Sequence, residues 1–222
     1  MAEFTLVIGN RNYSSWSLRG WLMAKIAGIA FDEIVVPLDL PETQAAIAEH
    51  SPSGRVPVLL HGEVTVWESL AIAEYLNDLR PDAGLWPASV AARAHARAVS
   101  AEMHAGFAML RTHMPMDIRA SHPGKGMTPD VRTDIDRITG LWRDCRQRLA
   151  KMASKDDGFL FGTTSAADAM YAPVVTRFRT YGVKLDADAD TYCNTVLAHP
   201  AMVDWIEAAK REPWSIAQYE AT

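Results

Sequence analysis

The sequence predicts an α/β domain with a small sheet, followed by a longer all-α domain. Two periodicities support this fold class. Short β-branched runs alternate with helical patterns over residues 1–80, whereas apolar residues spaced three and four apart fill the rest of the chain. A helix-breaking run, Arg80-Pro81-Asp82-Ala83-Gly84, lies between the two patterns. We therefore expect one domain over residues 1–82 and a second over residues 88–222.

The first domain contains four predicted strands and three predicted helices. The strands are short and β-branched, and the helices carry apolar residues at helical spacing. The predicted strands cover residues 4–8, 31–38, 58–60 and 64–67, and the predicted helices cover residues 17–27, 43–48 and 69–79. The last two strands are joined by a hairpin turn. This order, βαβα followed by ββα, is that of the thioredoxin fold, in which ligands bind at strand ends.

The second domain is predicted to consist of long amphipathic helices. Apolar residues recur at helical spacing over residues 92–114 and again over residues 131–152. Thr128-Pro129 precedes the second stripe and combines a preferred cap with proline at the first helical position. Two long helices with no strand between them are typical of an all-α helical bundle.

Two further helices are marked by their first residues. Ser165 and Asp168 form a capping-box pattern, so we interpret both as structural residues that start a buried helix. Pro173 interrupts that helix, and His199-Pro200 opens the last clear one.

The composition limits the classes of function. The 222 residues carry a net charge of −5, which disfavours a nucleic-acid partner because phosphate neutralisation dominates that binding. No apolar run approaches the roughly 18 residues that a spanning helix needs, so no membrane partner is expected. Cys145 and Cys193 are isolated and no basic leader precedes the first strand, which favours a reducing, cytoplasmic location. No Cys/His group has metal-ligand spacing, so no metal is expected.

The stretch around Pro57 has the features of a peptide clamp. Proline cannot donate to a sheet ladder, and a Val56-Pro57 bond at a strand entry is a candidate for the cis isomer. A cis bond would turn the N–H and C=O of Val56 away from the sheet, where an extended ligand can pair with them. Glu68-Ser69 adds a hydroxyl and free N–H groups at a helix start, where carboxylates bind well.

The charge near this clamp is unevenly spread. Residues 1–80 hold five Lys or Arg against ten Asp or Glu. An acidic domain can bind an anion only through locally placed cations, and Arg19 and Arg55 are the ones beside the clamp motifs.

The serines between the first strand and the first helix allow two interpretations. Ser15 or Ser17 can cap the helix while Trp16 packs beneath it. Alternatively, an exposed hydroxyl donates a hydrogen bond to a thiolate held by the clamp. Such a bond is worth roughly 1.5–3 kcal/mol, which would lower a thiol pKa of about 8.5 by roughly one to two units. No Ser-His-Asp arrangement is apparent, so a serine nucleophile is not expected.

Together these motifs resemble those of the cytosolic glutathione S-transferases. They are the run Ser14-Ser15-Trp16-Ser17-Leu18-Arg19, the pairs Val56-Pro57 and Glu68-Ser69, the all-helical second half and the box from Ser165 to Asp168. The nearest class is zeta, whose signature is Ser-Ser-Cys-Ser-Trp-Arg. Trp16 replaces its cysteine and Leu18 replaces its tryptophan, so the motif departs from that of the maleylacetoacetate isomerases in this class.

The resemblance implies the glutathione transferase fold and a role for each motif residue. Ser14 would stabilise the thiolate of glutathione, the cosubstrate, and Ser15 is an alternative one residue away. Val56 would pair with the cysteinyl backbone beside cis-Pro57. The other implied glutathione contacts are Arg19, Arg55, Glu68 and Ser69, of which the last two would hold the γ-glutamyl end.

A second substrate would bind beside glutathione. Trp16, Met109 and Met116 could line an adaptable apolar pocket, because methionine suits surfaces that accept varied ligands. His104, on the same stretch, is interpreted as solvent-facing or as hydrogen-bonded in a structural role.

The implied function is a homodimeric glutathione transferase that attacks a small apolar electrophile. Two alternatives stay open. The same thiolate could serve a glutathione-dependent isomerase or peroxidase, which substrate screening would distinguish. A non-catalytic binding or regulatory protein could also keep the fold and the clamp, and only this last protein could lack glutathione binding.

Overall fold

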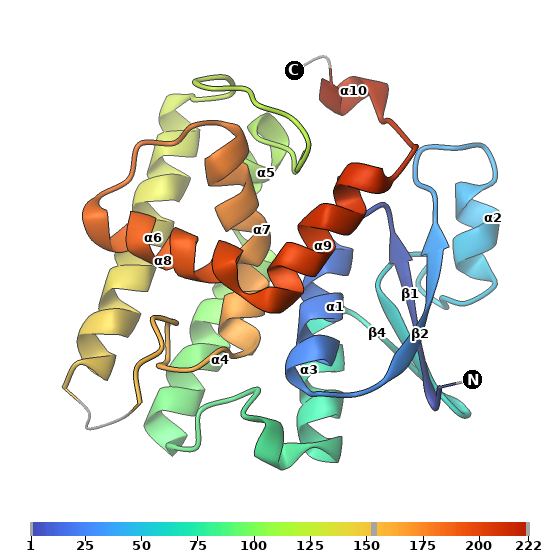
Figure 1. The fold of residues 1–222 in the computed structure, drawn as a ribbon, viewed down its shortest axis with the longest axis horizontal. Coiled ribbons are helices and arrows are strands. Elements are labelled where there is room, and N and C mark those ends of the chain that lie inside the picture. Colours follow the sequence, from blue (N-terminus) through green and yellow to red (C-terminus); the bar gives the residue numbers. More distant parts are fainter. Residues whose placement is uncertain (1, 152–154, 221–222) are drawn as a thin grey trace.

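The structure is a computed structural model that describes residues 2–151 and 155–220. A four-stranded sheet with three helices forms the part near the N-terminus, and the remaining helices lie to one side of it (Figure 1). The strands are β1 (Phe4–Gly9), β2 (Phe31–Val36), β3 (Val58–His61) and β4 (Val64–Trp67). The helices of this part are α1 (Ser15–Ile26), α2 (Thr43–Ala48) and α3 (Ser69–Leu79).

The sheet has the strand order β2-β1-β3-β4. β1 is parallel to β2 and antiparallel to β3, which forms a hairpin with β4. With helices on both faces, this is the thioredoxin-like arrangement that the sequence predicts.

The two faces of the sheet have separate cores. Successive residues of a strand point to opposite faces, so Leu6 and Ile8 of β1 pack against α1 and α3. Val7, between them, packs with Ile47 of α2 on the other face. β1 therefore carries α1 and the loop before it on the face that meets the helical region.

The helical region follows a short 3-10 turn, η1 (Pro81–Ala83). Its helices are α4 (Val90–Ala105), α5 (Ala108–His113), α6 (Pro129–Leu149), α7 (Ala166–Thr180), α8 (Ala187–Ala198), α9 (Pro200–Arg211) and α10 (Ala217–Glu220). α7 is almost entirely buried, and α1 packs against both α7 and α9 (Figure 1). One continuous hydrophobic cluster therefore extends from Leu6 in the sheet to Trp205 in α9.

The prediction of one continuous helix over residues 92–114 is wrong, because this segment forms two helices, α4 and α5. Phe107 adopts a left-handed backbone with φ of 61° directly after Gly106. Arg111 supplies the reason, since its guanidinium donates to the Gly106 carbonyl at 3.1 Å and also to the Met103 carbonyl. These carbonyls end α4 without intrahelical partners, and the side chain takes the place of the next turn.

Helix starts agree more closely with the sequence. The Thr128 side chain accepts a hydrogen bond from Val131 N–H at 3.2 Å at the start of α6. Ser165 and Asp168 form the predicted capping box of α7. The predicted stripe of α6 is buried as far as Leu149, while its last member, Met152, lies outside the described residues.

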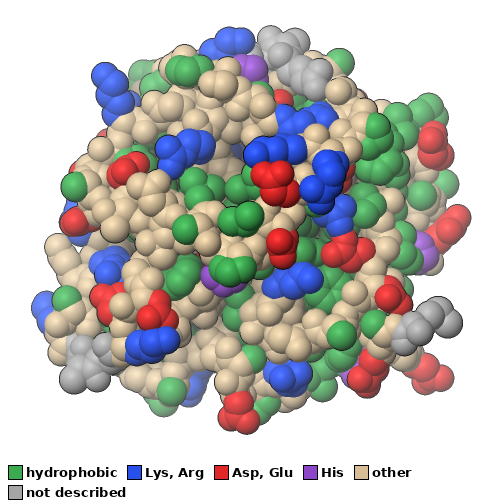
Figure 2. All heavy atoms as spheres, in the orientation of Figure 1, with side chains coloured by type: hydrophobic (Ala, Val, Ile, Leu, Met, Phe, Trp, Pro, Cys, Tyr) green, Lys and Arg blue, Asp and Glu red, His purple; other side chains and the backbone are tan. Residues whose placement is uncertain are grey.

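Basic and acidic side chains are interspersed on the face shown in Figure 2, with no broad field of one sign. Among the described residues, every helix is too short or too polar to cross a bilayer.

Candidate active site

A cavity of about 250 Å³ lies where the loop before β3, the start of α3 and the end of α4 meet α1. Its lining residues are Trp16, Ser53, Arg55, Val56, Pro57, Glu68, Ser69 and His104. Segments from four separate parts of the chain thus converge on it. Six of the residues predicted from the sequence line this cavity together, and Ser53 and His104 are additional.

The Val56-Pro57 bond is cis, as predicted. In the described part of the chain, neither the N–H nor the C=O of Val56 has a hydrogen-bond partner. The Ser51 hydroxyl holds the adjacent residue, since it donates to the Arg55 carbonyl at 2.7 Å and accepts from Arg55 N–H at 3.2 Å. The loop is therefore fixed while the Val56 peptide groups stay available to an extended ligand.

Glu68 and Ser69 present the start of α3 to the same cavity. Glu68 has φ of 67° and ψ of 126°, an unusual conformation for a residue other than glycine. Such strain persists only where the surroundings enforce it, and it is common at ligand sites. Ser69 is the first residue of the helix, where the N–H groups have no intrahelical acceptor, and its hydroxyl donates to the Met170 sulfur at 3.8 Å.

Ser14 caps α1, whereas the capping interpretation of the sequence points to Ser15 or Ser17. Its oxygen accepts from Ser17 N–H at 3.3 Å and its hydroxyl donates to the Ser17 hydroxyl at 2.7 Å. Ser17 in turn accepts from Gly9 N–H at 2.9 Å. The Ser14 proton is therefore shared with a neighbouring hydroxyl, and Ser14 does not line the cavity.

Ser15 differs from Ser14 in its hydrogen bonding. Its backbone N–H donates to the Tyr13 carbonyl at 3.1 Å and its carbonyl accepts from Arg19 at 3.3 Å. Within the described ranges the Ser15 hydroxyl has no hydrogen-bond partner, and its oxygen is not fully buried. Like Ser14, it is outside the lining of the cavity at cis-Pro57.

Trp16 forms a wall of the cavity and contacts two cations. The guanidinium carbons of Arg19 and Arg111 lie 4.6 and 4.7 Å from its ring centre, within the range of cation–π attraction. His104 meets the same ring edge-on at 5.0 Å and lies 3.5 Å from the Glu68 carboxylate. Burial lowers the pKa of His104, which favours the neutral ring.

Arg19 is not positioned as a direct contact to a ligand. The side chain is fully buried, and its Nε donates to the Met170 carbonyl at 2.9 Å. Burial lowers the pKa of its guanidinium, and the positive charges of Arg111 and Arg177 lower it further. Arg19 therefore affects the cavity through Trp16, whereas Arg55 is exposed at its rim.

Only one of the three residues predicted to contact the second substrate lines the cavity. Trp16 lines the cavity, but Met109 and Met116 do not. Met116 is buried in the core with 1% exposure, and Met109 is half-buried against the same core. His104, interpreted from the sequence as solvent-facing or as hydrogen-bonded in a structural role, lies in the cavity wall.

Gly20 lets α1 approach Pro57 closely, and this contact can be tested. A Cβ at Gly20 would lie 2.8 Å from Pro57 Cγ. We expect Gly20→Ala to lower the free energy of unfolding by about 1 kcal/mol, since overpacking costs about 1–3 kcal/mol and alanine regains roughly 0.5–1 kcal/mol in a helix.

The matched control is Gly140→Ala, because a Cβ at this α6 position meets nothing within 4 Å. This variant should be stabilised by roughly 0.5–1 kcal/mol. Urea unfolding measures both variants, and a stabilised Gly20→Ala would contradict the close contact with Pro57.

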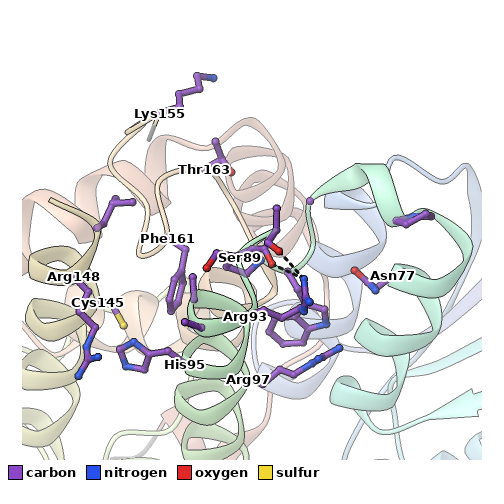
Figure 3. A pocket seen from close by; sticks show the side chains of 18 of the residues that line it. Asn77, Ser89, Arg93, His95, Arg97, Cys145, Arg148, Lys155, Phe161 and Thr163 are labelled. Atoms are coloured by element: carbon purple, nitrogen blue, oxygen red, sulfur yellow. Dashed lines mark hydrogen bonds between the residues drawn. The ribbon is translucent and has the colours of Figure 1, made fainter. Parts of the chain in front are cut away.

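A larger cavity of about 840 Å³ lies elsewhere, between the start of α4, the end of α6 and the loop that follows (Figure 3). Its cations are already engaged: Arg148 pairs with Asp144, and Arg93 donates to two backbone carbonyls. Burial raises the pKa of its thiol, Cys145, to about 12, so that thiol is a poor nucleophile. This chemistry makes it a weaker candidate than the cavity at cis-Pro57.

Comparison with known proteins identifies related chains. Residues 13–79 match the family model described as glutathione S-transferase, N-terminal domain. A dichloromethane dehalogenase from Methylorubrum extorquens is 45% identical over 60 residues, which cover 26% of this chain and only 21% of that protein. A probable maleylacetoacetate isomerase from Caenorhabditis elegans is 27% identical over 79% of this chain and 78% of its own length.

Two further matches concern the family and the fold. A glutathione transferase homologue from Burkholderia, solved with bound glutathione, superposes with a TM-score of 0.68 at 24% identity, over 96% of this chain and 100% of that one. A probable glutathione transferase from Aplysia californica is 35% identical over 37% of this chain and 87% of its own length. With the family-model match at residues 13–79, these similarities show that the chain belongs to the glutathione S-transferase family.

Proposed function

We propose that this protein is a glutathione transferase that activates the glutathione thiol with a serine hydroxyl at the start of α1. The observation that carries the proposal is the convergence of the unpaired Val56 peptide groups, the Ser69 hydroxyl and the Glu68 carboxylate on one cavity. The relative solved with bound glutathione supports glutathione as the cosubstrate.

The clamp suits the polar groups of this tripeptide. The N–H and C=O of Val56 pair with the cysteinyl backbone as a strand edge would. The γ-glutamyl carboxylate accepts from Ser69 and from the N–H groups that begin α3, while the ammonium group of the same residue meets Glu68. Arg55, exposed at the rim, adds a positive charge in a domain where acidic residues outnumber basic ones.

Ser14 activates the thiol by turning its hydroxyl from Ser17 to the sulfur. The neutral hydrogen bond that it gives up is worth about 0.5–1.5 kcal/mol, whereas a hydrogen bond to a thiolate is worth about 1.5–3 kcal/mol. The net gain of about 1 kcal/mol lowers the thiol pKa by roughly one unit. Ser15 is the alternative donor, and its unpartnered hydroxyl is the observation that favours it.

The thiolate then attacks a small apolar electrophile that binds against Trp16, with Met109 and Met116 as more distant members of the pocket. A carbon–sulfur bond forms while the leaving group departs with the electron pair of its bond. The dehalogenase relative supports a displacement of this kind. The isomerase relative supports the glutathione-dependent isomerase as the second candidate, and peroxidase chemistry or a non-catalytic role rank below both.

We also propose the location, oligomeric state and domain organisation of the enzyme. It acts as a cytoplasmic homodimer without a metal, with a glutathione-binding domain over residues 1–82 and a second-substrate domain over residues 88–222. Among the described residues, no group of His, Cys, Asp and Glu side chains is arranged to hold a metal ion.

Glutathione binding to wild type and to Ser69→Ala tests the clamp. We expect the substitution to weaken binding roughly ten- to a hundredfold, because a hydrogen bond to the substrate carboxylate is lost. Isothermal calorimetry measures the dissociation constants. Ser89→Ala is the matched control, since Ser89 is exposed and makes no capping hydrogen bond at the start of α4. Equal affinity in all three proteins would refute the clamp. If wild type does not bind glutathione, the remaining hypothesis is a non-catalytic binding or regulatory protein.

A further inference from the structure

Glu212, just beyond α9, binds the loop that carries Ser14. Its two carboxylate oxygens accept from Arg11 N–H at 2.8 Å and from Asn12 N–H at 3.1 Å. The Arg11 guanidinium lies 3.7 Å from the same carboxylate. Glu212 is only 8% exposed, so these charge-assisted hydrogen bonds are shielded from water.

The loop between β1 and α1 is a tight turn that ends at Ser14. The Asn10 carbonyl accepts from Tyr13 N–H at 3.3 Å and from Ser14 N–H at 2.8 Å, which closes the turn. The N–H groups of Arg11 and Asn12 therefore have no acceptor within the turn itself, and Glu212 provides one for each. A displacement of these two peptides moves Ser14 directly, because only one residue separates it from Asn12.

The helical region holds the other side of the same turn. The Asn12 side chain donates to Asp117 at 2.8 Å and accepts from Arg119 N–H at 2.9 Å. Arg119 extends the connection, since its guanidinium donates to the Glu212 carbonyl at 2.7 Å. The Trp205 indole N–H donates to the Arg11 carbonyl at 3.0 Å. The peptide groups of Arg11 and Asn12 are thus both fixed by partners from beyond residue 116.

We propose that Glu212 is a positioning residue for thiol activation: its carboxylate fixes the turn before α1 and thereby the direction of the Ser14 hydroxyl. This inference rests on the proposed role of Ser14. Small displacements of a donor matter because the strength of a hydrogen bond falls steeply with angle and distance. The C-terminal part of the chain is, on this view, a component of the thiol site although it does not touch the clamp.

Glu212→Gln tests the proposal, because the amide keeps the shape of the side chain but leaves one of the two N–H groups facing an NH2 group instead of an oxygen acceptor. We expect the thiolate fraction of bound glutathione at neutral pH to fall about threefold, with a similar fall in kcat/KM for a chlorodinitrobenzene probe. The dissociation constant of glutathione should change little, since the Val56 and Ser69 contacts are unaltered. Thiolate absorbance against pH and calorimetry give the two quantities.

Glu207→Gln is the matched control, as an exposed glutamate on α9 paired only with Lys210 in the described structure. Glu212→Asp, which keeps the charge but is one methylene shorter, is the second variant if Glu212→Gln fails to fold. It should shift the thiol pKa in the same direction. In a Ser14→Ala background, the effect of Glu212→Gln on the thiol pKa should disappear.

The outcomes separate this inference from the proposal on which it rests. If Ser14→Ala raises the thiol pKa but Glu212→Gln does not, the positioning role of Glu212 is wrong and the serine mechanism stands. If Ser14→Ala has no effect, the serine assignment fails first and the inference falls with it. A Glu212→Gln variant that loses stability and glutathione affinity with an unchanged thiol pKa would show a purely structural contact.

Discussion

Replacing Ser14 by alanine is expected to raise the pKa of the bound glutathione thiol by roughly one unit and to lower kcat/KM at neutral pH about tenfold. The lost hydrogen bond stabilises only the charged form of the sulfur, so the thiol rather than the thiolate becomes the dominant species. Glutathione itself should still bind, because the substitution leaves the proposed contacts of Val56, Glu68 and Ser69 unaltered.

The measurement is thiolate absorbance of the binary complex against pH, together with turnover of a chlorodinitrobenzene probe. The sign follows from the titration: the activity of Ser14→Ala should recover as the pH rises through the raised pKa, whereas wild type should level off about one unit earlier. A variant that stays inactive at high pH would mean that Ser14 does more than set the thiol pKa.

Ser15→Ala is the matched comparison, since both serines lie at the start of α1 and neither lines the cavity at cis-Pro57. The Ser14 proton is engaged by Ser17 at 2.7 Å, and the Ser15 hydroxyl has no such partner in the described ranges. A normal titration in Ser14→Ala with a raised pKa in Ser15→Ala would move the activating hydroxyl by one residue.

The clamp was predictable because its signals are local. Residues close together in the sequence determine each of its parts: a proline at a strand entry, a two-strand hairpin and a helix start. The predicted helix over residues 69–79 matches α3 at both ends. The Val56-Pro57 bond is cis as predicted, and six of the predicted residues meet in one cavity.

Features that depend on distant partners could not be predicted in this way. The break between α4 and α5 depends on the Arg111 side chain returning to the carbonyls at the end of α4. His104 enters the cavity wall because the end of α4 packs near Glu68, which no spacing in the sequence indicates. Glu212 reaches Arg11 across 201 positions, a contact that only the packing of α9 against α1 creates.

The methionines illustrate a different limit. Met116 follows Pro115, beyond the end of the apolar stripe, so its pattern gives no burial preference. In the structure it is almost fully enclosed by the core. The residue type suggests an adaptable surface, but the packing of the core around Met116 leaves no such surface there. The preference of methionine for adaptable surfaces therefore predicted the second-substrate pocket less well than the local motifs predicted the clamp.

Asp168→Ala is expected to lower the free energy of unfolding by roughly 3–5 kcal/mol, since it leaves several buried donors without an acceptor. The Asp168 carboxylate accepts from four groups: Leu160 N–H at 3.1 Å, Ser165 N–H at 2.9 Å, the Ser165 hydroxyl at 2.8 Å and the Tyr192 hydroxyl at 3.1 Å. It thus joins the loop before α7, the start of α7 and α8, which all lie in the core of the helical region.

Urea unfolding measures this loss, with Asp204→Ala as the control because Asp204 is exposed on α9. Ser165→Ala should cost only about 1 kcal/mol, the usual effect of losing one cap. If the box merely started α7, both substitutions would have this smaller effect. A much larger loss of stability for Asp168→Ala would mean that the carboxylate joins three segments. Because α7 packs against α1, the same variant should also weaken glutathione binding on the far side of α1.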